Sequence, residues 1–340
     1  MIEITTVGLD LAKSIFHLVG IDHRGKEQVR KKLRRHQVLA YVAQLPSCVI
    51  AMEACAGSNY WYRQFEALGH TPRIIAAERV KAYVDGNKND YNDARAIAEA
   101  ATRANMRFVA AKTLVQQELQ TLLRMRELQI RQRTALCNQM RSILAEQGLV
   151  VPPGVARLKQ HLANALETPD NGLTPLLREL LADAREQLRV LEAGIDLLER
   201  KLLEASRSVA SVKLLQSIPG YGPIVATAMV CAIGDGKTFQ RGRDVSASVG
   251  LVPAQYSTGG KDVLLGISKR GDYYLRQVLI HGARSVILQA TRRDDRLSRW
   301  VMGLCERRGK NRATVALANK LARIGWAVLR HQTPYCAVAA

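Results

Sequence analysis

Residues 88–101 read KNDYNDARAIAEAA and place two aspartates, Asp90 and Asp93, at the beginning of an alanine-rich segment. The alanines favour a helix, and side chains three positions apart on a helix lie on one face, roughly 5–6 Å apart. Two carboxylates at that separation repel each other unless a cation lies between them. Alternatively, one aspartate caps the helix and the other faces solvent near its positive end.

The residues before this segment predict an α/β domain. Short apolar runs rich in β-branched residues are typical of buried strands, and the intervening amphipathic segments are typical of helices. We predict strands at 4–9, 14–21, 28–33, 48–52 and 73–77, and helices at 36–45 and 59–68. Three strands followed by alternating helix and strand is the order of a ribonuclease-H-like fold.

Two further acidic residues follow predicted strands. Asp10 comes after the first strand and Glu53 after the strand at 48–52. Parallel neighbours in such a sheet end at the same edge, so these two carboxylates should converge with Asp90 and Asp93. Carboxylate oxygens suit Mg²⁺ or Mn²⁺, and two such ions about 3.5–4 Å apart can hold phosphate oxygens during phosphoryl transfer. The four acids therefore predict a metal site for phosphoryl chemistry.

The chain is strongly basic. Its 340 residues hold 50 Lys and Arg against 30 Asp and Glu, for a net charge of +20 and a pI of about 10.0. Residues 241–340 alone hold 18 Lys and Arg against 6 Asp and Glu. This balance indicates a polyanionic partner, most simply nucleic acid, with an ordinary basic surface as the alternative.

Cysteine usage and the N-terminal residues indicate the compartment. The six cysteines are scattered without a C-x-x-C pair, which argues against a zinc site or a disulfide framework and fits a reducing cytosol. The opening MIEI lacks the basic region and apolar core of a signal peptide. No window approaches 18 uncharged apolar residues, so we expect no membrane span and a cytoplasmic protein.

The middle of the chain predicts two long helices. Apolar residues recur at heptad-like steps over residues 112–148, and from Leu177 to Leu202 they alternate steps of four and three without interruption. The second pattern is that of a coiled-coil seam. The residues between, from about 150 to 175, are interpreted as a linker. The seam is compatible either with an intramolecular hairpin or with dimerisation.

The C-terminal third carries two glycine-rich motifs. Residues 217–226, SIPGYGPIVA, are typical of a helix-hairpin-helix turn whose backbone N–H groups approach a phosphate, or of an ordinary turn between helices. Residues 255–261, QYSTGGK, form a loop rich in hydroxyl groups and glycine, followed by a basic helix. The predicted nucleic-acid contacts are Gly220, Gly222, Lys261, Lys269, Arg270 and Arg276.

Together these motifs make the sequence resemble, over nearly its whole length, a transposase of the bacterial insertion-sequence 110/1111 group. The segments that carry the resemblance are GLDLAK at 8–13, MEA at 52–54, NDYNDA at 89–94, IPGYG at 218–222 and YSTGGK at 256–261. The resemblance implies a RuvC-like DEDD domain at 1–110, a helical coiled-coil region at 111–210 and a mostly α-helical C-terminal transposase domain at 211–335.

The resemblance also implies roles for individual residues and partners. Asp10, Glu53, Asp90 and Asp93 match the metal-binding DEDD set, and Ser257 matches the family's nucleophile; the residues alone do not separate Ser257 from the nearby hydroxyls of Thr258 and Ser268. Implied partners are donor and target DNA and a structured guide RNA, at the bacterial nucleoid.

We therefore expect a site-specific DNA recombinase that excises and inserts its own element, with Mg²⁺ or Mn²⁺ and a serine nucleophile. Because two duplexes must exchange strands, and because the seam from Leu177 to Leu202 gives protomers a way to pair, we expect a homodimer that assembles into a tetramer. One alternative is a metal-only RuvC-like junction nuclease in which water attacks. The other is a non-catalytic RNA- or DNA-binding protein.

Overall fold

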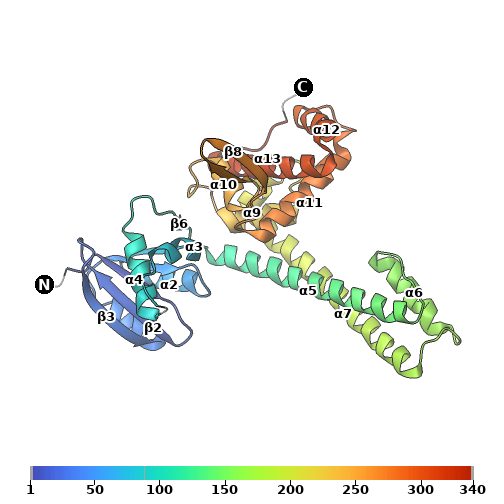
Figure 1. The fold of residues 1–340 in the computed structure, drawn as a ribbon, viewed down its shortest axis with the longest axis horizontal. Helices are drawn as coiled ribbons and strands as arrows, with labels where there is room; N and C mark the ends of the chain where they lie inside the picture. Colours follow the sequence, from blue (N-terminus) through green and yellow to red (C-terminus); the bar gives the residue numbers. More distant parts are fainter. Residues whose placement is uncertain (1–2, 88, 338–340) are drawn as a thin grey trace. The chain divides into compact units, whose positions relative to one another are not determined.

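The computed structural model describes residues 3–87 and 89–337 and divides into two compact units, residues 1–114 and 115–340 (Figure 1). Three residues of the segments considered above, Met1, Ile2 and Lys88, lie outside the described residues. The long helices of the middle region and the C-terminal helices belong to one unit.

The first unit is built on a mixed six-stranded sheet of order β3-β2-β1-β4-β5-β6. The strands are β1 (Thr6–Asp10), β2 (Ile15–Ile21), β3 (Glu27–Arg34), β4 (Val49–Glu53), β5 (Thr71–Ile75) and β6 (Phe108–Val109). Strands β1, β4 and β5 are parallel, and β2, β3 and β6 extend the sheet with antiparallel pairings. The prediction of an α/β N-terminal domain is confirmed, although the last predicted strand ends at Ile75 because Ala77 begins a helix.

Helices cover both faces of this sheet. They are α1 (Val38–Val42), α2 (Ser58–Ala67), α3 (Ala77–Val80) and α4 (Asp90–Ala101), with 3₁₀ turns at Arg35–Gln37 and Lys81–Tyr83. Side chains alternate between the faces of a strand, so Leu9 and Met52 pack with α1 and α2, whereas Ala51 and Ile75 pack with α4. The central strands β1, β2 and β4 are therefore buried on both faces, as their apolar residues require.

Helix α4 lies unusually close to the first strand, and Gly8 makes this possible. A Cβ at Gly8 would lie 2.0 Å from the carbonyl oxygen of Ala94 and 2.5 Å from the backbone nitrogen of Ala98. Only glycine, which has no Cβ, allows backbone to approach backbone at this distance. The beginning of α4 is thereby held against β1, two residues before Asp10.

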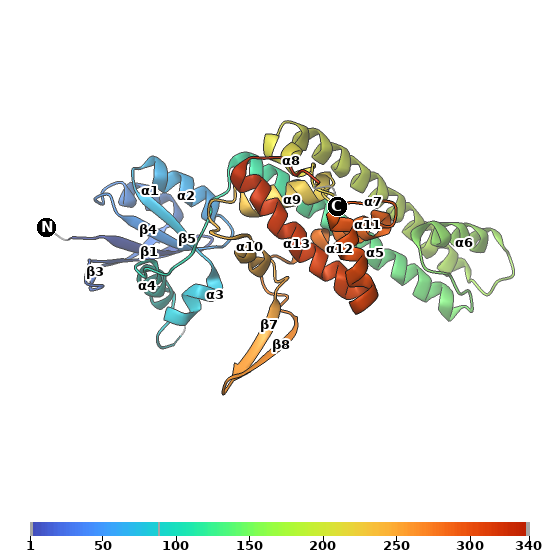
Figure 2. The ribbon, with the colours of Figure 1, turned by 90° about the horizontal axis from the view of Figure 1, so that it is seen from above.

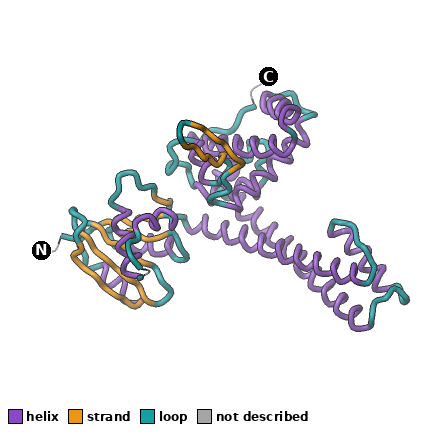
Figure 3. Tube along the Cα trace, viewed as in Figure 1, coloured by secondary structure: helices purple, strands orange, loops and turns teal. Residues whose placement is uncertain are grey.

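The second unit begins with a pair of long helices, α5 (Leu114–Glu146) and α7 (Pro175–Arg207), which run side by side in opposite directions (Figures 1 and 3). A helix, α6 (Val155–Glu167), occupies half of the segment that we predicted as a linker. The linker prediction is wrong there because Leu158 and Leu162, one helical turn apart, are fully buried against α5 and α7. Only its flanks are irregular.

The apolar seam on α7 packs within the same chain. Leu181 and Leu188 share a cluster with Cys137 and Met140 of α5, and Leu202 shares another with Leu119. Arg126 of α5 donates two hydrogen bonds to Glu199 of α7. Of the two interpretations left open by the sequence, the helical hairpin accounts for the buried seam.

The remaining residues form a helical bundle with one β-hairpin. Its helices are α8 (Ala210–Leu215), α9 (Pro223–Ile233), α10 (Gly242–Ser248), α11 (Tyr273–Ala290), α12 (Arg296–Arg308) and α13 (Lys310–His331), and its strands are β7 (Pro253–Thr258) and β8 (Lys261–Ile267). Helix α9 is buried at its centre, against α11 and near Tyr221, whose hydroxyl donates to the carbonyl oxygen of Leu321 at 2.9 Å. Figure 2 shows the hairpin extending away from the helices of its unit.

No helix in the described parts of the chain combines the length and apolar character needed to cross a bilayer.

Candidate active site

Asp10 and Glu53 lie at the ends of two neighbouring parallel strands. Asp10 ends β1 and Glu53 ends β4, and the register pairs Leu9 with Met52 just before them. Because successive side chains alternate between the faces of a sheet, Asp10 lies on the same face as Gly8, and Glu53 on the same face as Ala51. That is the face covered by α4.

The other two acids begin the helix on this face. Asp90 and Asp93 are in the first turn of α4, whose N-terminus is capped by Asn89: its side-chain oxygen accepts a 2.9 Å hydrogen bond from the N–H of Tyr91. Since Asn89 is the cap, neither aspartate is needed for capping. That finding removes half of the alternative explanation given for the pair in the sequence.

Burial and neighbouring carboxylates raise the pKa values of Asp10 and Glu53. Burial raises the pKa of Asp10, and the charges of Asp93, Asp90 and Glu53 raise it further, against a smaller opposite effect of His17. Burial likewise raises the pKa of Glu53, and the charge of Asp93 adds to the shift. The fold therefore concentrates negative charge that would be stabilised by a cation.

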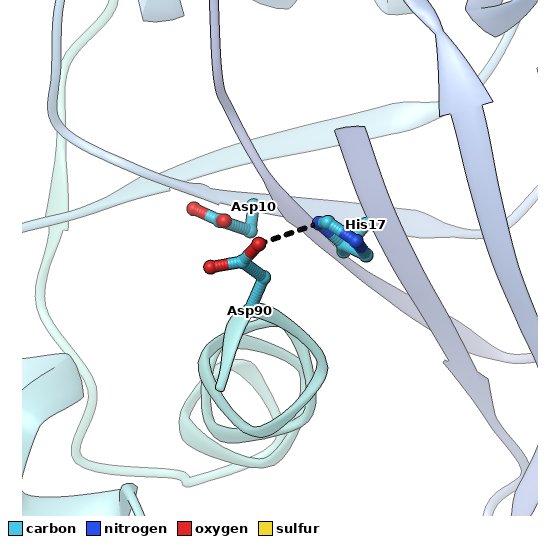
Figure 4. Close-up of side chains that lie close together, drawn as sticks. All are labelled: Asp10, His17 and Asp90. Carbon is cyan, nitrogen blue, oxygen red and sulfur yellow. Dashed lines mark ion pairs between the residues drawn. The ribbon is translucent and has the colours of Figure 1, made fainter. Parts of the chain in front are cut away.

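His17 is a further member of this cluster that the sequence did not reveal. It pairs with Asp10 across β1 and β2, is 8% exposed, and its Nδ1 lies 3.4 Å from a carboxylate oxygen of Asp90 (Figure 4). Among the described residues, Nδ1 has no hydrogen-bond partner of acceptable geometry. Asp10, His17 and Asp90 each offer one ligand atom within 4.8 Å of the others.

These residues fit a divalent metal ion. A buried imidazole nitrogen whose 3.4 Å contact with Asp90 lacks hydrogen-bond geometry is costly, and so are partly buried carboxylates whose like charges raise the pKa of Asp10. A cation among Asp10, His17 and Asp90 would relieve both costs. Oxygen ligands favour Mg²⁺ or Mn²⁺, and the imidazole would favour Mn²⁺ of the two.

Ser257 lies in the second unit, on an exposed β-hairpin rather than in the irregular loop that its glycines suggested. It is in β7 and pairs with Asp262 of β8, and the Gly259–Gly260 turn has positive φ at both residues, as two-residue hairpin turns favour. The side-chain amide of Gln255 donates to the Ser257 hydroxyl oxygen at 2.8 Å and to Asp262 at 3.1 Å. The hydroxyl is therefore oriented and open to solvent.

The predicted basic contacts differ in their surroundings. Lys261, Lys269 and Arg270 are exposed. Arg276 is only 8% exposed, and its guanidinium donates to the carbonyl oxygens of Val249 at 2.8 Å and Arg270 at 3.2 Å. The prediction that Arg276 contacts phosphate does not fit this burial. The Arg276 side chain instead holds in place the segment that leads into α11.

The two predicted glycines also differ. Gly220 has a φ of +84°, and a Cβ there would lie 2.8 Å from the carbonyl oxygen of Gly282 in α11, so packing alone requires glycine. Gly222 precedes α9, is exposed and has open space around it. Only Gly222 leaves room for a ligand at this turn.

Known proteins resemble this chain over its whole length. A family profile of DEDD type described as "Transposase" matches residues 7–147, and one described as "Transposase IS116/IS110/IS902 family" matches residues 212–298. The chain is 45% identical over 334 residues to a probable family 20 transposase of Pseudomonas aeruginosa, which covers 98% of this chain and 99% of that protein.

Two other relatives are transposases of named elements. The transposase for insertion sequence element IS1111A of Coxiella burnetii is 44% identical over 335 residues, covering 98% of this chain and 92% of that protein. The transposase for insertion sequence element IS1328 of Yersinia enterocolitica is 39% identical over 335 residues, covering 98% and 99%.

Proposed function

The chain belongs to the IS116/IS110/IS902 family of transposases, and we propose that it excises and inserts an insertion-sequence element by metal-assisted strand cleavage with a serine nucleophile. It is a DNA transposase, so its substrate is DNA. The observation that carries the proposal is the convergence of Asp10, Glu53, Asp90 and Asp93 on one face of the sheet, joined by His17, whose Nδ1 lies 3.4 Å from Asp90.

The acids would hold a divalent ion, Mg²⁺ or Mn²⁺. Asp10, His17 and Asp90 each supply a ligand atom within 4.8 Å of the others, and Glu53 and Asp93 add charge beside them. An ion bound there offsets the negative charge that develops on a phosphate during cleavage.

The proposed nucleophile is Ser257. Its Oγ would form a bond to phosphorus while the bond from phosphorus to a deoxyribose oxygen breaks; the serine proton passes to solvent and the leaving oxygen takes up a proton. A serine hydroxyl is a weak nucleophile and needs such a charged environment. The serine–DNA bond conserves the phosphodiester, so the reverse attack by a DNA hydroxyl would rejoin strands without ATP. The hydrogen bond from Gln255 supports this role because it orients the hydroxyl.

The proposal includes a structured guide RNA and assembly on nucleic acid. The net charge of +20 supports binding of more than one polyanion. Two duplexes with two strands each call for a dimer that pairs into a tetramer, at the bacterial nucleoid where its DNA lies. Because the seam on α7 is covered by α5, the protomers would pair through other surfaces. A specific short RNA should copurify, and ribonuclease treatment should stop recombination.

Trapping of the covalent intermediate tests the proposal. Wild-type protein incubated with its element's DNA and Mg²⁺ should give a protein–DNA adduct on a denaturing gel, with the nucleotide on the peptide that holds Ser257. Ser257→Ala should bind DNA normally yet give neither cleavage nor adduct. Thr258→Ala, at the next exposed residue of β7, and Ser268→Ala are the matched controls and should retain the adduct.

Two results would change the assignment. Cleavage by Ser257→Ala without an adduct would mean that water attacks, as in a metal-only junction nuclease. Full strand exchange in EDTA would remove the metal from the mechanism.

A further inference from the structure

The C-terminal helices and the base of the hairpin enclose a groove of about 1600 Å³ that includes none of the predicted site residues. Its walls are the beginning of α10, the end of β8, Trp300 of α12 and one side of α13 from Asn311 to Ala327. Pockets for small molecules measure about 300–1,000 Å³. A groove of this size suits a polymer better.

The charge of the groove has one sign. Five cationic side chains line it, and among the described residues no Asp or Glu does; the five are Arg241, Arg243, Arg312, Lys320 and Arg323. Burial lowers the pKa of Lys320, and the charges of Arg296 and Arg323 lower it further. Cations that disfavour one another in this way would be stabilised by an anionic occupant.

Two of the three tryptophans of the chain also line the groove. The ammonium nitrogen of Lys320 lies 4.2 Å from the centre of the Trp300 ring. The indole nitrogen of Trp326 donates to the carbonyl oxygen of Gly236 at 3.0 Å, which fixes that ring in place. Both rings are half-buried, so each is held by the protein while part of it faces the groove.

We propose that this groove binds an unpaired DNA strand. A positively charged groove with fixed aromatic rings is the arrangement by which proteins bind single strands: cations follow the phosphates and bases stack on the rings. A duplex keeps its bases stacked inside and would use only the charge. This inference rests on the proposed function, which supplies DNA as the substrate and strand cleavage as the source of an unpaired segment.

The groove adjoins the hairpin that carries Ser257. Gly266 and Ile267 of β8 line it, and β8 pairs with β7. A strand seated in the groove would therefore reach the hairpin at its base. Ser257 pairs with Asp262 nearer the turn, so the groove would hold the DNA on the same hairpin as the proposed nucleophile while strands are exchanged.

A binding titration on the full-length protein tests the charge of the groove. The probe is a fluorescein-labelled 20-nucleotide oligothymidylate, followed by anisotropy at fixed salt. The double variant Arg312→Gln/Arg323→Gln should bind about tenfold more weakly, because two phosphate contacts are lost. The double variant Arg284→Gln/Arg292→Gln removes the same charge from exposed sites of α11 and the turn after it, outside the groove, and should change affinity less than twofold. Equal effects of the two variants would overturn the proposal.

A second titration tests stacking. An abasic strand of the same length keeps the phosphates without bases, and wild-type protein should bind it about tenfold more weakly than oligothymidylate. In Trp300→Leu that difference should shrink, while Trp300→Phe should retain it. Unchanged discrimination in a folded Trp300→Leu protein, judged by circular dichroism, would overturn the stacking role.

Two other occupants are distinguished by the same proteins. Tenfold tighter binding of oligouridylate than of oligothymidylate, lost in Arg312→Gln/Arg323→Gln, would overturn the DNA assignment in favour of RNA. If Arg312→Gln/Arg323→Gln lost self-association in light scattering but still bound oligothymidylate normally, the DNA assignment would be overturned, and a second copy of the chain would be the occupant of the groove. The adduct assay on wild-type protein is independent of these titrations, so failure of the groove and failure of the proposed function are separate results.

Discussion

Substitution of Gly8 by alanine should displace the helix that carries Asp90 and Asp93. The added Cβ would lie 2.0 Å from the carbonyl oxygen of Ala94 and 2.5 Å from the nitrogen of Ala98, both of them backbone atoms that no rotamer change can move. To restore a separation of about 3.5 Å, α4 must retreat from β1 by about 1.5 Å. Overpacking of this kind costs about 1–3 kcal/mol.

Hydrogen exchange followed by mass spectrometry measures this effect locally. If the cost lies in the contact between α4 and β1, amides of peptides covering residues 90–101 should exchange about 5- to 150-fold faster, while α5 and α7 keep their protection. Calorimetry should show weaker Mn²⁺ binding as well, since Asp90 moves away from Asp10 and His17. Ala98→Gly should not rescue the variant, because the two closest contacts are with backbone atoms that this change leaves in place.

A matched control is Gly266→Ala, at an exposed strand position where a Cβ meets no atom within 4 Å. It should leave exchange in α4 and Mn²⁺ binding unchanged. If Gly8→Ala also leaves both unchanged, α4 is not held by this contact, and the account of how the acids converge is refuted.

Three further outcomes are expected. Ile195→Asp should cost several kcal/mol of unfolding free energy in thermal melts, because it places an unpaired charge at a buried position of α7. Leu197→Asp, at a position 44% exposed on the same helix, should be nearly neutral. A folded Ile195→Asp monomer would instead place the seam between protomers. Tyr221→Phe removes a buried hydrogen bond to α13 and should lower the free energy of unfolding by about 1 kcal/mol in denaturant titrations, so an unchanged midpoint would contradict its contribution. Asp93→Asn relieves repulsion on Asp10 and should raise the melting temperature without metal while reducing the stabilisation by Mn²⁺ in scanning fluorimetry; the opposite signs would argue against a shared charge cluster.

The α/β unit was predictable because its signals are local. Apolar β-branched runs end at Asp10 and Glu53, and strand alternation together with the register that pairs Leu9 with Met52 assigns both acids to one face. The beginning of α4 was also readable from its alanines. The sequence left open whether Asp90 and Asp93 cap the helix or bind a cation. Capping is not needed from either, because Asn89 accepts the hydrogen bond at the beginning of the helix.

The packing of the helical region was harder to predict, because a periodic apolar stripe indicates that one helix face is buried but not which partner covers it. The seam from Leu177 to Leu202 has the same spacing whether a second protomer or the chain's own α5 covers it, and the structure has the latter. The missed helix α6 has a different cause. Prolines and glycines flank it closely at 152–154 and 169–172, so turn signals outweighed the four-residue spacing of Leu158 and Leu162.

Charge in the sequence says little about where a cation lies. Arg276 and Arg270 look alike as parts of a basic segment, yet one guanidinium is buried on carbonyl oxygens and the other is exposed. The cations of the groove come from α10 and α13, some 70 residues apart, and only the fold brings Arg243 and Arg323 to one surface.

His17 shows the same limit at the acid cluster. In the sequence it is one polar residue in an apolar strand, and only its pairing with Asp10 and the approach of α4 give it a ligand's position. Nδ1 of His17 faces Asp90 without a good hydrogen bond. A leucine at this buried position would have no polar atom to satisfy, so the fold keeps a histidine here at a cost in stability. Natural folds retain such atoms where a function repays the cost. His17 thus adds an imidazole to the four acids, which supports the proposal that this edge of the sheet binds a cation.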